Sequence, residues 1–93
     1  MLDAGHLSSI RGKLGLPQEQ MAHLLGVSFA SVNRWEGGQS SPGGPIRDLY
    51  LALDAAIKGG NSAEAILRAA NNERGAFLYS LFRMAYSRPM RAR

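Results

Sequence analysis

The 93-residue chain contains no cysteine and only two histidines, which stand apart in the sequence. A disulfide framework and a thiolate metal site are therefore excluded, and the histidines have no neighbours that would complete another metal site. No apolar run approaches the roughly 20 residues that a membrane-spanning helix needs, and the first residues lack the charged-then-apolar layout of a signal peptide. We expect a cytoplasmic protein that carries no metal and no cofactor and binds no membrane.

Arrangements of residues that support catalysis are also missing. No serine, histidine and acid set and no phosphate-binding glycine loop stands out, and the glycines at 37, 38, 43 and 44 do not follow a predicted strand. His23 falls on the outward face of a predicted helix, where most histidines are only solvated, and His6 lies near a chain start that we expect to be frayed. We predict that the chain is not an enzyme.

Acidic residues are scarce compared with basic ones. Seven Asp and Glu face eleven Lys and Arg, nine of which are Arg, so the net charge is +4. Such an excess suits a polyanionic partner without proving one, because many small domains share it. The length allows one small domain with a single core.

Alternation of apolar residues with a period of two is absent, whereas apolar residues recur at helical spacing, so we predict an all-α fold. Six helices are predicted, over about 4–14, 18–25 and 29–36, from Pro45 to the glycine pair at 59 and 60, from Ser62 to about 70, and over about 73–86. The residues 87–93 hold three arginines and are expected to be frayed. The apolar faces of the six predicted helices contain Leu7, Ile10, Leu14, Met21, Ala22, Leu25, Val32, Trp35, Ile46, Leu49, Tyr50, Leu53, Ile57, Ala65, Ile66, Ala69, Phe77, Leu78, Leu81, Phe82 and Ala85.

The second and third predicted helices, with the turn between them, form the most informative stretch, residues 18–37. Ala22 is small enough for the two helices to pack closely, Gly26 supplies a left-handed stop, and Ser28 supplies a side-chain cap for the next helix. A small residue, then a glycine, then a buried aliphatic residue is the signature of a helix-turn-helix.

With its flanking residues, this stretch resembles the Cro/repressor-type (XRE-like) helix-turn-helix family. The resemblance is carried by Leu-Gly-Leu-x-Gln-Glu over 14–19, Leu-Gly-Val-Ser over 25–28, Arg-Trp-Glu-x-Gly over 34–38, and Pro42. It covers about residues 7–53, with weaker support to 70. It implies a five-helix lambda-repressor-like DNA-binding domain over 1–70, followed by a sixth helix and basic tail over 71–93 that serve as a candidate dimerisation element.

The resemblance also implies a function, which is sequence-specific binding of double-stranded DNA in the major groove by a homodimeric transcriptional repressor. In this docking mode the second helix of the motif presents its N-terminal residues to base edges. Arg34 suits guanine, Asn33 suits adenine, and Phe29 and Ala30 offer only apolar contact, most simply to a thymine methyl. The alternatives are a phosphate contact or solvent for Arg34, solvent for Asn33, and a core or dimer contact for Phe29.

Several flanking residues complete the implied interface. Gln18 matches a family glutamine that often touches the DNA backbone and braces a base-reading side chain, while Pro17 replaces the usual cap at a cost of about 1 kcal/mol. The loop over 38–41 lies where family members contact the opposite phosphates of the DNA. The alternative is a flexible connector. The implied DNA-contacting residues are Gln18, Ser28, Phe29, Ala30, Ser31, Asn33, Arg34, Gln39 and Ser40.

Arg11 and Glu36 occupy positions that the family often joins in a partly buried ion pair between the first and third helices. If this pair forms, Arg11 is structural rather than a phosphate ligand, and Lys13 and Arg47 become better candidates for nonspecific attraction to DNA. Loss of one partner would leave the other charge stranded.

The sixth predicted helix leaves two roles open. Its stripe of Phe77, Leu78, Leu81 and Phe82 caps the core or meets the same stripe on a second subunit. Two other functions are therefore kept as alternatives. One is an antitoxin-like or adaptor subunit whose sixth helix binds a protein partner, and the other is a DNA-targeting fragment of a larger modification enzyme.

Overall fold

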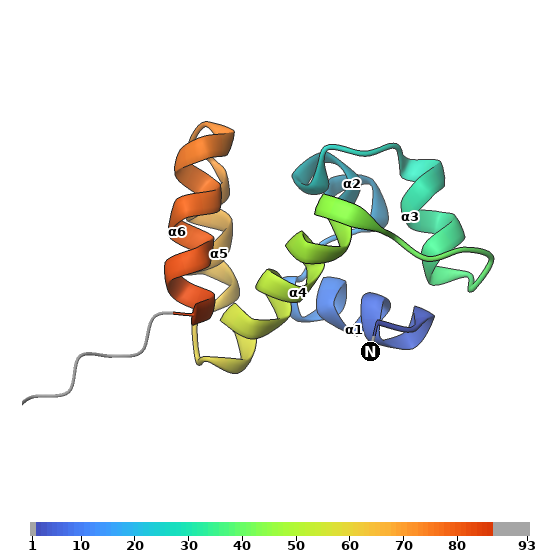
Figure 1. Ribbon diagram of the computed structural model, residues 1–93, viewed down its shortest axis with the longest axis horizontal. Helices are drawn as coiled ribbons and strands as arrows, with labels where there is room; N and C mark the ends of the chain where they lie inside the picture. Colours follow the sequence, from blue (N-terminus) through green and yellow to red (C-terminus); the bar gives the residue numbers. More distant parts are fainter. Residues whose placement is uncertain (1, 87–93) are drawn as a thin grey trace, which may run out of the picture.

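The computed structural model describes residues 2–86, and within them the chain forms six α-helices and no strand (Figure 1). The helices are α1 (Ala4–Leu14), α2 (Gln18–Leu25), α3 (Phe29–Glu36), α4 (Gly44–Lys58), α5 (Ala63–Ala70) and α6 (Arg74–Tyr86). The prediction of an all-α fold with six helices is confirmed. The segment 87–93 with its three arginines, which was expected to be frayed, lies outside the described residues.

Local capping explains where three of these helices begin. The side chains of Asp3, Ser28 and Ser62 each accept a hydrogen bond from the backbone N–H three residues further on, at 2.8, 3.1 and 3.0 Å. Each bond satisfies an amide that the first helical turn leaves without a partner. Pro17 precedes α2 and makes no side-chain cap, as its lack of a hydroxyl predicts.

Glycine explains the turn between α2 and α3. Gly26 ends α2 with a φ of 76°, and its N–H bonds back to the carbonyl of Ala22 at 2.9 Å. A side chain is disfavoured in this left-handed conformation. The chain therefore reverses within a few residues, and Ser28 begins α3 directly afterwards.

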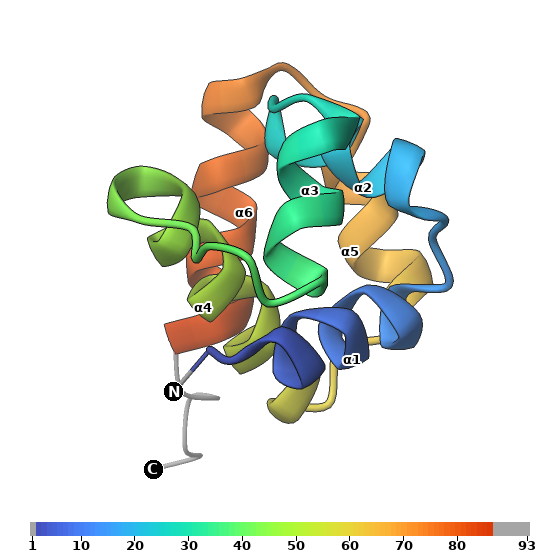
Figure 2. The same ribbon diagram turned by 90° about the vertical axis from the view of Figure 1, so that its right-hand side faces the viewer.

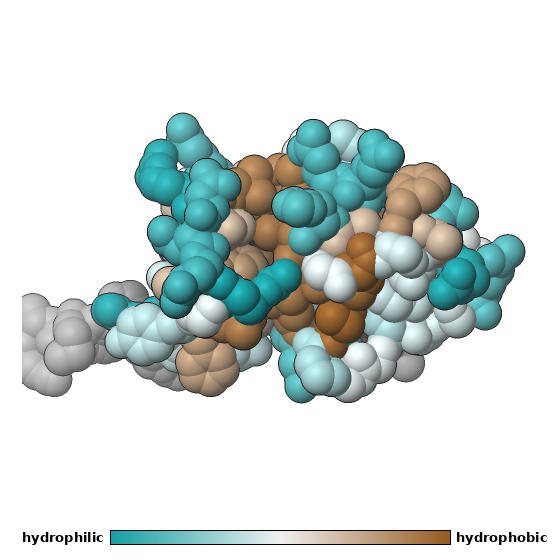
Figure 3. Space-filling view, turned by 90° about the horizontal axis from the view of Figure 1, so that it is seen from above, coloured by the Kyte–Doolittle hydropathy of each residue, from teal (hydrophilic) through white to brown (hydrophobic). Residues whose placement is uncertain are grey.

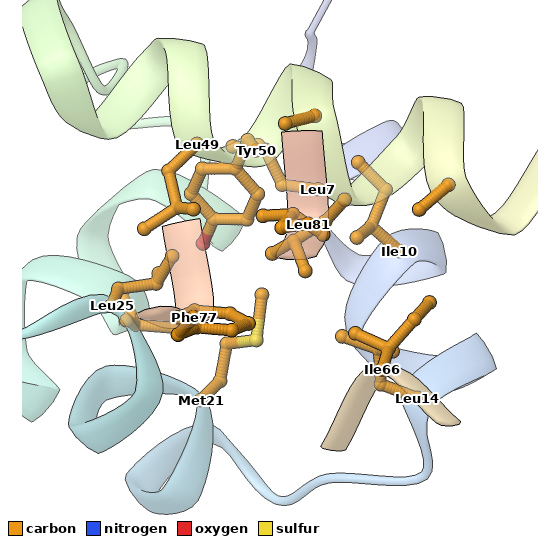
Figure 4. Packing of buried hydrophobic residues seen from close by; sticks show 14 of the residues in the cluster. Leu7, Ile10, Leu14, Met21, Leu25, Leu49, Tyr50, Ile66, Phe77 and Leu81 are labelled. Atoms are coloured by element: carbon orange, nitrogen blue, oxygen red, sulfur yellow. The ribbon is translucent and has the colours of Figure 1, made fainter. Parts of the chain in front are cut away.

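Side chains from all six helices form one buried hydrophobic cluster, and they point toward one another from the different helices (Figure 4). Its largest members are Tyr50, Phe77, Leu7, Ile10, Met21, Leu53, Ile66, Leu81 and Val32. Because Phe77 and Leu81 belong to this cluster, α6 completes the core rather than standing beside it. No helix among residues 2–86 is long and apolar enough to cross a bilayer.

The apolar stripe predicted on α6 divides into two pairs. Phe77 and Leu81 are only 2% and 1% exposed, whereas Leu78 and Phe82 are 44% and 62% exposed. Residues four apart lie on one side of a helix, while a shift of one residue turns the side chain by about 100°. The expectation that all four form a single contact face is therefore wrong, because the first pair faces α4 and the interior.

The two ends of the molecule are occupied by different helices. In Figure 1, α3 lies at one end and the α5–α6 hairpin at the other, and Figure 2 shows α3 in front with α6 behind it. The hairpin packs on α4 and α1. A groove with an apolar floor and hydrophilic walls lies between the hairpin and α2 (Figure 3).

Candidate nucleic-acid interface

The two sides of α3 differ in chemistry. Val32 is fully buried, and the half-buried Trp35 lies with its ring edge-on to Tyr50 at a centroid distance of 6.2 Å. The opposite side of the helix exposes Phe29, Ala30, Asn33 and Arg34. A helix held by its inner side, with its outer side free, is the arrangement that insertion into a DNA groove requires.

An ion pair between α1 and α3 holds the C-terminal end of α3. Arg11 donates two hydrogen bonds to the Glu36 carboxylate, from Nε at 2.8 Å and from Nη2 at 2.9 Å, and a third to the carbonyl of Leu16 at 2.8 Å. The hydrogen bond to Glu36 raises the pKa of Arg11. Burial alone would raise the pKa of Glu36, but hydrogen bonds from Arg11 and Gln18 outweigh it and lower that pKa. The pair is fully charged near neutral pH.

Gln18 connects this ion pair to the exposed face of α3. Its Nε2 donates to Glu36 Oε1 at 3.0 Å, and its Oε1 accepts a hydrogen bond from Asn33 Nδ2, also at 3.0 Å. A continuous chain of hydrogen bonds therefore runs from Arg11 through Glu36 and Gln18 to Asn33. The Oδ1 of Asn33 and its second N–H are not used in this chain.

Serines order the leading end of α3. Besides capping the helix, Ser28 Oγ lies 3.0 Å from Ser31 Oγ, and Ser31 Oγ accepts a hydrogen bond from Arg34 Nη2 at 3.4 Å. Arginine has five N–H donors, so this contact orients the Arg34 guanidinium and leaves most of its donors for another acceptor.

The remaining sequence-predicted residues are exposed. Gln39 and Ser40 are exposed in the loop after α3, where Gln39 N donates to the carbonyl of Arg34 at 3.0 Å. Phe29 is 51% exposed, so the alternative that it packs in the core is wrong. Lys13 and Arg47 are also exposed.

A buried acid between α1 and α4 was missed by the sequence reasoning. Asp54 is only 7% exposed, and its Oδ2 lies 3.2 Å from His6 Nε2 and 3.0 Å from Lys58 Nζ. The expectation that His6 lies near a frayed start is therefore wrong. The spacing of Asp54 and Lys58 at i and i+4 was a visible signal, but nothing in the sequence joins His6 to a residue 48 positions later.

Tyr50 is a second polar group inside the core. Its ring is fully buried against Trp35, and among the described residues its hydroxyl has no hydrogen-bond partner. Burial raises the pKa of this hydroxyl to about 12. Within residues 2–86, no three histidine, aspartate or glutamate side chains gather in the way that a metal ion needs.

Comparison with known protein families identifies the part of the chain that contains α2 and α3. Residues 7–46 match a family model described as helix-turn-helix, which includes α2, α3 and the loop after α3. Over these residues the chain matches the XRE-type helix-turn-helix family. The resemblance stated from the sequence is confirmed, and this helix-turn-helix is a DNA-binding unit. Neither the curated proteins nor the solved structures gave a match to the chain.

Proposed function

We propose that the protein binds specific sites in double-stranded DNA as a homodimeric transcriptional repressor, with α3 in the major groove. One observation carries this proposal. Two exposed polar side chains of α3, Asn33 and Arg34, are oriented by hydrogen bonds that they donate to Gln18 and Ser31. Side chains that are ordered before binding lose less conformational entropy when they meet a base.

The bonding pattern indicates which bases are read. Asn33 donates one N–H to Gln18 and keeps Oδ1 and its other N–H, which are the two groups that pair with adenine N6 and N7. Arg34 keeps enough donors to bond guanine O6 and N7. Each such bidentate contact contributes about 1–3 kcal/mol of discrimination between bases.

Residues around α3 are proposed to contact the DNA backbone. The free amides at the start of α2 beside Gln18, the hydroxyls of Ser28 and Ser31, and the loop residues Gln39 and Ser40 supply neutral donors for phosphates. Such contacts place the duplex without reading its sequence. Because bound phosphates release counterions, affinity should fall steeply as salt concentration rises.

A second copy of the chain is proposed to dock at α6. Leu78, Phe82 and Tyr86 are exposed beside a hollow of about 470 Å³ between α4 and α6. Because α3 lies at the other end of the molecule (Figure 1), a contact through α6 leaves both recognition helices uncovered. The two half-sites would lie about one helical turn, ~34–36 Å, apart.

The same apolar hollow supports a second function, an antitoxin-like or adaptor subunit that binds a protein partner through α6. The distinguishing measurement is the mass of the purified protein in solution. A dimer that dissociates on changing Phe82→Ser favours self-association, whereas a monomer that captures one defined partner through the same residues favours the adaptor function.

Selection from a pool of random duplexes, followed by titration of the enriched site at several salt concentrations, tests DNA binding, symmetry and specificity together. We expect a pseudo-palindromic site. Changing Arg34→Ala should reduce affinity for the enriched site far more than affinity for random duplex. The control is Arg68→Ala, because Arg68 is exposed on α5. Equal losses on both duplexes would reject base reading by Arg34.

A further inference from the structure

The leading end of α3 is apolar, although it belongs to a face proposed to read DNA. Phe29 and Ala30 are the first two residues of the helix, and both are exposed, Phe29 to 51%. Phe29 is not among the side chains that form the hydrophobic core or pack against it. The hydrophobic core therefore does not explain an aromatic ring at this position.

The serines on either side of Phe29 and Ala30 in the sequence make hydrogen bonds within the helix. Ser28 Oγ accepts from the backbone of Ser31, and the hydroxyls of the two serines lie 3.0 Å apart. Ser31 Oγ also accepts from Arg34. A base edge placed against Phe29 and Ala30 consequently meets a phenyl ring and a methyl group rather than a hydrogen-bonding group.

Only one apolar group projects into the major groove, the C5-methyl of a pyrimidine. Thymine carries it, cytosine and uracil lack it, and 5-methylcytosine carries it on a base that otherwise pairs like cytosine. A purine or cytosine at this position would instead lose hydration of its N7, O6 or N4 group without gaining a partner.

We infer that Phe29, supported by Ala30, reads a pyrimidine C5-methyl, so that the protein binds DNA with thymine or 5-methylcytosine at one position more tightly than DNA with uracil or cytosine there. Phe29 and Asn33 are four residues apart and share one side of α3, about 6 Å apart along its axis. The methyl-reading and adenine-reading positions therefore belong to the same half-site. This inference rests on the proposed DNA binding through α3.

A subunit contact is the other occupant to consider for Phe29. The side of α3 that carries Phe29 continues into Asn33 and Arg34, which are polar and exposed. The helix α6, which carries the other exposed aromatic residues, lies at the opposite end of the molecule from α3 (Figure 1). The ring is thus continuous with the DNA-binding face and remote from the apolar surface that suits a second protein chain.

The test uses the full chain and the duplex enriched by selection. Each thymine is replaced in turn by deoxyuridine, which removes only the C5-methyl group. We expect affinity to fall about threefold to tenfold at one position of each half-site, the size expected for burial of one methyl group. In a duplex with C·G at that position, 5-methylation of the cytosine should raise affinity by a similar factor.

Variants assign the effect to its residue. Phe29→Ala should bind the thymine and deoxyuridine duplexes equally, and it should fold because Phe29 is largely exposed. The matched control is Tyr79→Ala on α6, another exposed aromatic residue, which does not line the hollow proposed for the second subunit. It should keep the difference between the two duplexes.

Two results would overturn the inference while leaving the proposed function intact. One is equal binding of thymine and deoxyuridine duplexes at every position by the unmodified protein. The other is a Phe29→Ala variant that becomes monomeric but keeps the thymine preference. If no duplex is enriched at all, the proposed function fails and this inference fails with it.

Discussion

The two ends of the molecule expose different kinds of surface. On α3, Asn33 is joined by hydrogen bonds through Gln18 to a partly buried ion pair between α1 and α3. On α6, the exposed residues include three aromatic side chains, and two of them, Phe82 and Tyr86, contact each other with ring centroids 4.7 Å apart. Reading a base depends on atoms placed to within about 0.5 Å, whereas an apolar contact depends mainly on buried area. The surface on α3 therefore needs hydrogen bonds that position its side chains, and the surface on α6 does not.

The sharpest contrast is expected between two phenylalanines on α6. Changing Phe77→Ala should lower the free energy of unfolding by about 3–5 kcal/mol, because it opens a cavity in the core. Changing Phe82→Ala should alter it by no more than about 0.5 kcal/mol in the monomer, because the ring is 62% exposed. Urea unfolding monitored by circular dichroism checks both values. Similar losses in the two variants would contradict the division of α6 into an inner and an outer side.

Two glutamates provide a similar test at the other end. Changing Glu36→Ala should lower the free energy of unfolding by about 3 kcal/mol, because it strands the partly buried Arg11 guanidinium. Its control is Glu64→Ala, which removes an exposed partner of Arg68 at 3.6 Å and should change stability by less than about 0.5 kcal/mol. A Glu36→Ala variant as stable as its control would show that the ion pair does not hold α3.

Much of the fold could be predicted from the sequence, because its helix ends depend on local signals. Asp3, Ser28 and Ser62 act as caps through residues only three positions away, and Gly26 closes its turn through neighbouring carbonyls. Contacts between distant segments could not be predicted in this way. The pairing of His6 with Asp54 exists only because α1 packs across α4.

Side-chain roles on the surface were only partly predictable for a related reason. Helical spacing gave the inner residues Val32 and Phe77, but it did not separate Phe77 from its neighbour Leu78. That separation depends on how far α6 is rotated about its axis against α4, which a broad apolar stripe does not determine. The candidate bracing role of Gln18 came from the family resemblance, and the structure identifies Asn33 as the side chain that it contacts.

A smaller effect is expected when Gln18, which joins Glu36 to Asn33 by hydrogen bonds, is replaced. Changing Gln18→Ala should reduce the preference for adenine at the base facing Asn33 by about tenfold, because the Asn33 amide loses the partner that orients it. The preference at the base facing Arg34 should persist, since Arg34 is oriented by Ser31. Binding to duplexes substituted at each position measures both preferences. A uniform loss at all positions would instead indicate that Gln18 contributes only to the backbone contact.

The smallest effect concerns how the contribution of Asp54 to the free energy of unfolding changes in acid. Burial alone would raise the pKa of Asp54, but hydrogen bonds from Lys58 and His6 outweigh it and lower that pKa in the folded protein. A carboxyl group with a lowered folded pKa stabilises the fold fully above its unfolded pKa of about 3.9, and this contribution disappears as pH falls through the folded value. Changing Asp54→Asn should therefore cost about 1 kcal/mol at pH 7 and progressively less below about pH 4. Unfolding by urea across pH 2–7 measures the difference between the two proteins. A difference that stays constant down to the lowest pH would show that the charge of Asp54 contributes nothing to holding α1 on α4.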